Sequence, residues 1–183
     1  MTAGSAVVFD EGISGDLSGN FAAPTPVSFV FGANTIVGEI GDNGNTGATN
    51  GSDADYVSFT VPFGSSISSI NIDNFNPAAG IGLGSFMGFT NSLVFNGQTG
   101  ADINGSVIFN GASGDVLPAI NGGPLGPGDY SFWVQETAST TVGYQFTFSQ
   151  VPEPTSSGLL LATLTGFAMS RRQRPIGLLN DGV

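Results

Sequence analysis

The sequence predicts an all-β protein: an antiparallel two-sheet sandwich of the jelly-roll or Greek-key kind, followed by a short apolar helix near the C-terminus. Three observations predict this fold. Short runs alternate apolar and polar residues, 29 Gly and 10 Pro separate the runs, and no helical period is sustained before Pro154. Dipeptides that tolerate positive φ supply the hairpin turns; these Asn-Gly pairs begin at Asn43, Asn50, Asn96, Asn104, Asn110 and Asn121.

The expected strands are short runs rich in β-branched and aromatic residues. In chain order they are residues 6–9, 27–31, 34–40, 55–61, 69–72, 84–89, 92–95, 107–109, 129–134 and 143–149. The alternation is clearest in residues 55–61, where Ser58 and Thr60 are expected to face solvent. We expect residues 129–134 and 143–149 to pair as antiparallel neighbours.

The chain divides into a body and a C-terminal appendage. Residues 1–150 form the predicted sandwich, which is long enough for one hydrophobic core. Composition changes after Gln150, so that residues 151–174 form a separate segment and residues 175–183 a tail.

The charge distribution excludes several function classes. The chain has 14 acidic residues, 3 basic residues, no His and no Cys, which gives a net charge of -11. All three cations, Arg171, Arg172 and Arg174, lie after the body, so the body should repel nucleic acid. The lack of His and Cys excludes the usual zinc sites, disulfides, Cys nucleophiles and Ser-His-Asp triads.

Three adjacent features make up the C-terminal segment. Val151, Pro152, Glu153 and Pro154 form a proline-bounded motif, residues 155–170 are mostly apolar, and the arginines follow at once. As a helix, these 16 residues span about 24 Å, somewhat less than the roughly 30 Å hydrocarbon core. We expect them to enter a membrane, with the arginines on the cytoplasmic side and the body outside.

This arrangement resembles the PEP-CTERM sorting signal of exported bacterial proteins, although residues 175–183 extend beyond the usual end. The resemblance implies that a membrane-embedded exosortase recognises residues 151–154 and cuts near them. It also implies a non-enzymatic surface or extracellular-matrix protein that is membrane-anchored only as a precursor. Residues 1–6 carry no export signal, so we expect a leader encoded upstream of Met1.

A second resemblance covers part of the body. Residues 53–62, 125–134 and 144–148 are similar to the pre-peptidase C-terminal type of β-sandwich. Members of that family are non-catalytic accessory modules of secreted proteins. The resemblance therefore also implies a module that is not an enzyme.

Calcium is the one cofactor that the residues suggest. Asp53 and Asp55 lie two apart on an extended chain, point to the same side and could share an ion with other oxygen ligands. The spacing after Asp42 is not that of an EF-hand loop, because Gly44 and Thr46 stand where acidic or amide ligands are needed. The structural alternative is that both Asp side chains cap a turn.

Trp133 offers a possible ligand surface. It lies on the face opposite Phe132 and Val134 and is either an exposed sugar platform or covered by a loop. Together with calcium, it forms the alternative hypothesis of a calcium-dependent carbohydrate-binding module that contacts extracellular polysaccharide.

A carboxylate-based glycoside hydrolase is the remaining hypothesis. It would pair Glu136 with an Asp such as Asp73, Asp102 or Asp115. No spacing requires this pairing, and twelve carboxylates on a small body are expected to be solvated surface groups. We therefore expect no enzymatic activity.

Overall fold

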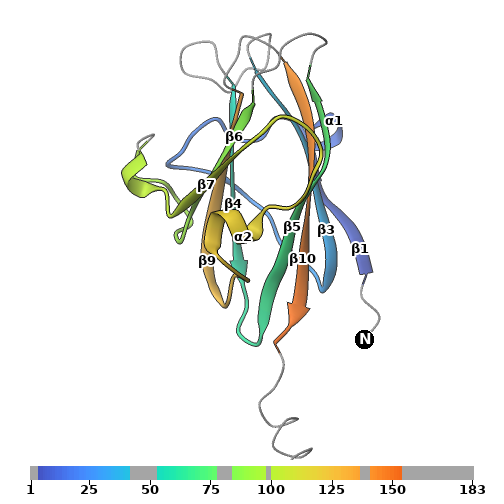
Figure 1. The fold of residues 1–183 in the computed structure, drawn as a ribbon, viewed down its shortest axis with the longest axis vertical. Helices are drawn as coiled ribbons and strands as arrows, with labels where there is room; N and C mark the ends of the chain where they lie inside the picture. Colours follow the sequence, from blue (N-terminus) through green and yellow to red (C-terminus); the bar gives the residue numbers. More distant parts are fainter. Residues whose placement is uncertain (1–3, 42–52, 78–83, 98–99, 137–140, 154–183) are drawn as a thin grey trace, which may run out of the picture. The chain divides into compact units, whose positions relative to one another are not determined.

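Two five-stranded sheets pack face to face in the computed structural model (Figure 1). The structure describes residues 4–41, 53–77, 84–97, 100–136 and 141–153. One sheet, called sheet A, has the strand order β1 (Gly4–Asp10), β3 (Gly32–Ile40), β10 (Val142–Pro152), β5 (Ser65–Pro77) and β8 (Ser113–Asp115). The other, sheet B, has the order β2 (Thr25–Pro26), β4 (Ala54–Val61), β9 (Gly128–Gln135), β6 (Ser85–Thr90) and β7 (Gly105–Phe109). The predicted sandwich is confirmed.

Both sheets are mixed, so the prediction of purely antiparallel sheets is wrong at their edges. β1 runs parallel to β3, and β2 runs parallel to β4. The reason is the path of the chain: after β1 it crosses to sheet B, forms β2 there, and returns to sheet A for β3. Strands joined by such a crossing can run in the same direction, which a tight hairpin does not allow.

Short helices connect some of the strands. They are α1 (Glu11–Ser14), α2 (Leu117–Asn121) and the 3-10 turn η1 (Gly100–Asp102). α1 directly follows β1 and starts the crossing toward sheet B, on the right of Figure 1.

Eight of the ten predicted runs overlap observed strands, but residues 27–31 and 92–95 do not form strands. In both segments a side-chain oxygen accepts from a backbone N–H that would otherwise bond to a neighbouring strand. The N–H of Val30 donates to Oδ1 of Asn34, and the N–H of Val94 donates to Oγ of Ser92. These local bonds replace the expected ladders.

The predicted pairing of residues 129–134 with 143–149 is also wrong. β9 pairs with β4 and β6 in sheet B, whereas β10 pairs with β3 and β5 in sheet A. The two strands face each other instead, and the ring of Phe132 contacts those of Phe146 and Phe148 at centroid distances of 6.2 and 5.3 Å. Aromatic contact across the sandwich thus replaces the hairpin.

The core lies between the sheets, where the inner faces contribute mostly Phe, Ile and Val. On β4, Val57 and Phe59 point into this core, as the alternation predicts. Thr60 is exposed as expected, but Ser58 is only 6% exposed because β2 and the following residue cover it. A second, smaller cluster of Ala54, Tyr56 and Phe95 covers the outer face of sheet B.

The chain separates into two compact units, Met1–Pro152 and Glu153–Val183. The predicted helix over residues 155–170 and the three arginines lie outside the described residues. Among the helices that the structure does describe, none has the length and apolar character needed to cross a membrane.

Candidate functional site

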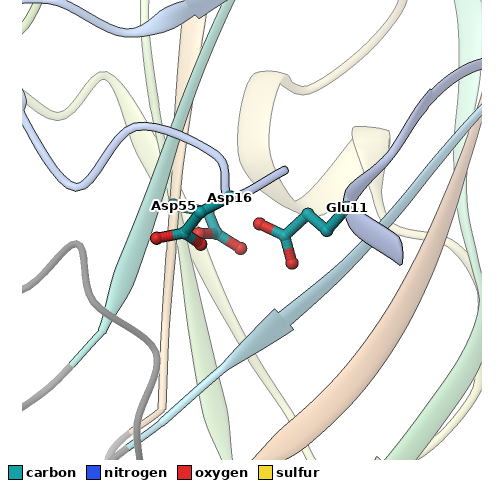
Figure 2. A group of neighbouring side chains, drawn as sticks. All are labelled: Glu11, Asp16 and Asp55. Atoms are coloured by element: carbon teal, nitrogen blue, oxygen red, sulfur yellow. The ribbon is translucent and has the colours of Figure 1, made fainter. Parts of the chain in front are cut away.

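Three carboxylates from two distant parts of the chain converge at one edge of the sandwich. They belong to Glu11, Asp16 and Asp55, and one oxygen from each lies within 4.8 Å of the other two. Figure 2 shows the Glu11 carboxylate facing those of Asp16 and Asp55. Glu11 opens α1, Asp16 lies in the crossing segment after α1, and Asp55 lies on β4. We refer to these three residues as the acidic cluster.

The crossing segment places Glu11 and Asp16 by a sequence of local hydrogen bonds. Oδ1 of Asp10 accepts from the N–H of Gly12 at 2.9 Å and caps α1, as an Asp at this position commonly does. Gly15, with φ of 86°, ends the single helical turn and redirects the chain. Leu17 then enters the core, and Ser18 accepts from the N–H of Tyr56 at 2.9 Å. The segment is thereby fixed against β4.

Asp55 points between the sheets and is completely buried. Its Oδ2 accepts a 2.6 Å hydrogen bond from the hydroxyl of Tyr144, but its Oδ1 has no hydrogen-bond partner among the described residues. Burial, followed by the charge of Glu11, raises the pKa of Asp55 well above its ordinary value of 3.8, while the Tyr144 bond opposes this rise. Burial and the charge of Asp55 likewise raise the pKa of Tyr144, which keeps its hydroxyl protonated as a donor.

Glu11 is held in position by two backbone groups. Its Oε1 accepts from the N–H of Leu17 at 2.7 Å, and its Oε2 accepts from the N–H of Glu39 at 2.5 Å. Burial is the largest cause that raises the pKa of Glu11 from 4.5 to about 7. The two backbone bonds lower this pKa, and the charges of Asp16 and Asp53 raise it. Glu11 is therefore oriented before any ligand arrives, and its negative charge is incompletely compensated.

No side-chain cation of the body can balance these charges, because the only basic residues in the chain are Arg171, Arg172 and Arg174. A buried carboxylate without a cationic partner either takes up a proton or binds a metal ion. Carboxylate oxygens are hard ligands and suit calcium. Asp16 is exposed, and Glu11 and Tyr144 also line a surface cavity of about 290 Å³, so the edge of the cluster is accessible from solvent.

The structure brings one of the two predicted calcium ligands into this cluster. Asp55 belongs to it, whereas Asp53 is buried nearby and acts on Glu11 and Asp55 through its charge. Sequence reasoning missed Glu11 and Asp16. The only signal for them in the sequence was that two carboxylates, Glu11 and Asp16, flank a short glycine-containing turn.

Trp133 is half-buried in the outer aromatic cluster and is not an open platform. Its ring stacks on Tyr56 at a centroid distance of 5.6 Å, and Phe86 meets it edge-on at 5.0 Å. One face of the indole is therefore occupied by protein. This packing favours the covered arrangement over the sugar platform.

The four carboxylates considered for glycoside hydrolysis lie outside the acidic cluster. Glu136 is buried and accepts from the hydroxyl of Ser85 at 2.7 Å. Asp115 accepts from the N–H groups of Ile70 and Leu117 at 2.9 and 3.0 Å, which is a structural role. Asp73 is exposed, and Asp102 is half-buried.

The predicted sorting motif starts inside the last strand. Val151 and Pro152 are exposed and lie opposite Ser66 and Ser65 of β5, and Glu153 is half-buried. Pro154 and the three arginines lie outside the described residues.

The chain matches no protein-family model, and comparison with curated proteins finds no similar protein. The functional interpretation therefore depends on the chemistry of the residues themselves.

Proposed function

We propose that this chain is an exported, non-enzymatic protein of the bacterial surface or extracellular matrix, sorted by its C-terminal segment. In this proposal an exosortase-type membrane protease recognises Val151, Pro152, Glu153 and Pro154. Residues 155–170 hold the precursor in the membrane, and Arg171, Arg172 and Arg174 stop its transfer.

The observation that carries the proposal is the position of the motif relative to the sandwich. β10 ends at Pro152, and the division of the chain into two units falls between Pro152 and Glu153. A protease needs an accessible, extended substrate, and segments where a domain ends are the usual sites of cleavage. Because Val151 and Pro152 belong to β10, a cut at Glu153 or after it would leave this strand intact.

The composition of the core gives further support. The buried hydrophobic residues of the body all lie between Leu17 and Phe148. The described core thus belongs to the part of the chain that precedes the motif, and we expect this part to stay folded after cleavage.

The test is to express the full precursor, with a leader, in an exosortase-bearing host and to compare it with Glu153→Ala. Asp73→Ala is the matched control, because it removes an exposed carboxylate of the same body away from the motif. We expect the unchanged protein and the control to be shortened and delivered to the surface or matrix, and Glu153→Ala to stay as membrane-bound precursor. Identical processing and location of all three proteins would refute the proposal.

A further inference from the structure

We propose that Glu11, Asp16 and Asp55 form a calcium site that ties the crossing segment after β1 to strand β4. This inference is independent of export and sorting, because it uses only residues of the sandwich. It differs from a site built on Asp53 and Asp55 alone, since two of its ligands come from a different part of the chain.

The distances fit one ion. Calcium–oxygen distances are about 2.3–2.6 Å, so two oxygens bound to the same calcium lie at most about 5 Å apart. One oxygen each from Glu11, Asp16 and Asp55 fulfils this condition, since all three lie within 4.8 Å of one another. Backbone carbonyls or water would complete the six to eight ligands that calcium commonly takes.

A second observation points to a ligand independently of the clustering. Asp55 is 0% exposed, yet its Oδ1 is buried without a hydrogen-bond partner among the described residues. Most buried polar atoms have a partner, and an orphaned one calls for a specific explanation such as an ion. Tyr144 occupies Oδ2 from the other sheet and so leaves Oδ1 for the ion.

The ligands are also oriented in advance. The backbone N–H groups of Leu17 and Glu39 each occupy one oxygen of Glu11 and fix the plane of its carboxylate. Each of these oxygens retains a further lone pair that can bind a cation. Asp16 is exposed and provides the side from which an ion enters.

Calcium would compensate the negative charge of the acidic cluster, which no side chain of the body can do. Three carboxylates whose oxygens lie within 4.8 Å repel one another when ionised, and Asp55 is shielded from water. The body contains no Lys, Arg or His that could pair with them. A divalent cation neutralises most of this charge, whereas protons would do so only while the pH is low enough.

The test uses the full chain, freed of metal and kept in mild detergent, in calcium titrations followed by calorimetry and thermal unfolding. We expect one calcium per chain, with a dissociation constant of about 10⁻⁵–10⁻³ M and a rise in the unfolding temperature. Magnesium at the same concentration and sodium at the same ionic strength should raise it far less. Absence of saturable calcium binding at millimolar concentration, or an equal effect of magnesium, would overturn the assignment.

Two variants test whether the ion binds at the acidic cluster. Asp16→Asn changes an exposed ligand without disturbing the core, and we expect it to weaken calcium binding at least about tenfold. Asp73→Asn removes the same charge from an exposed position outside the cluster, and its calcium affinity should be unchanged. Unweakened binding by Asp16→Asn, or equal weakening by both variants, would contradict a site at the acidic cluster.

Terbium, which replaces calcium at oxygen sites, gives a positional readout. Its emission should be excited through the ring of Tyr144, whose hydroxyl lies 2.6 Å from Oδ2 of Asp55, and calcium should displace it. We expect Tyr144→Phe to lower this sensitised emission. Full emission from Tyr144→Phe would contradict an ion whose nearest sensitising ring is that of Tyr144.

Discussion

The hydroxyl of Tyr144 donates a 2.6 Å hydrogen bond to Oδ2 of Asp55, and the two residues belong to different sheets. Both side chains are buried and point into the space between the sheets. This bond fixes the rotamer of Asp55 and connects β10 with β4 at the edge where the crossing segment covers the core. Tyr144 therefore contributes to stability and also positions a carboxylate of the acidic cluster.

Removal of this hydroxyl should destabilise the protein. Tyr144→Phe leaves the buried Oδ2 of Asp55 without its partner, and an unsatisfied buried acceptor costs roughly 1–3 kcal/mol. Tyr130→Phe is the matched control, because Tyr130 donates to a neutral carbonyl, that of Gly126, at 2.9 Å through a hydrogen bond that is only part-buried. We expect urea unfolding in calcium-free buffer to show the larger loss for Tyr144→Phe. Equal losses would mean that the charge of Asp55 adds nothing to this bond.

Asp55→Asn should have opposite effects with and without calcium. The amide keeps an oxygen that can accept from Tyr144, but it removes a buried negative charge that Glu11 and Asp53 repel. In calcium-free buffer at a pH above the raised pKa we expect the free energy of unfolding to rise by roughly 1 kcal/mol or more, since one unit of raised pKa corresponds to about 1.4 kcal/mol. In saturating calcium the variant should be less stable than the unchanged protein, because a ligand is lost. A variant that is less stable under both conditions would argue against uncompensated charge at Asp55.

The calcium-free protein should lose stability as the pH rises from about 4.5 to about 7. In the folded state the pKa of Glu11 is raised from 4.5 to about 7, and that of Asp55 is raised in the same direction. The folded state thus binds more protons than the unfolded state in this range, so the free energy of unfolding decreases as these protons are released. Besides each other, the side chains that act on the two carboxyls are Asp16, Asp53 and Tyr144, none of which is a cation.

This pH dependence can be measured by urea unfolding at pH 5 and pH 7.5 in calcium-free buffer. Glu11→Gln removes one of the two titrating groups and should make the dependence shallower. Stability that increases from pH 5 to pH 7.5 in the unchanged protein would contradict the expected sign.

Gly38 is required by the close approach of the Tyr144 ring, its register partner on β10. A Cβ at Gly38 would lie 2.4 Å from the Tyr144 hydroxyl oxygen and from Cζ, much closer than van der Waals contact allows. We expect Gly38→Ala to displace the ring and to cost roughly 1–3 kcal/mol, as overpacking commonly does. Gly143→Ala, where a Cβ meets nothing within 4 Å, is the control and should change stability by less than about 0.5 kcal/mol. Unfolding measurements that show equal effects would mean that the ring can move at little cost.

The sequence predicted most strands, because one face of each had to be apolar. Val57 and Phe59 illustrate this: their spacing of two residues places both on the inner face of β4, and the structure has them there. The sequence did not predict which strands pair. The apolar residues of 129–134 would be buried equally well whether this strand paired with β10 in one sheet or packed opposite it in the other sheet. The hydrophobic effect does not distinguish the two, because it is non-directional.

Loop segments were misjudged for a related reason. Residues 27–31 and 92–95 have strand-like composition, but side chains such as Asn34 and Ser92 take up their backbone N–H groups. Whether such a local bond forms depends on where the neighbouring segment lies. Composition does not contain this information.

The sequence by itself determined that carboxylates brought together in this body find no cationic side chain within the body, because every basic residue lies at or after Arg171. Only the tertiary structure decided which carboxylates these are. Asp55 could be picked out from its spacing to Asp53, but Glu11 and Asp16 reach it because the chain leaves sheet A after β1 and crosses to β4. That crossing results from the packing of two sheets around one core, and a contact between residues so far apart in the chain leaves no local pattern in the sequence.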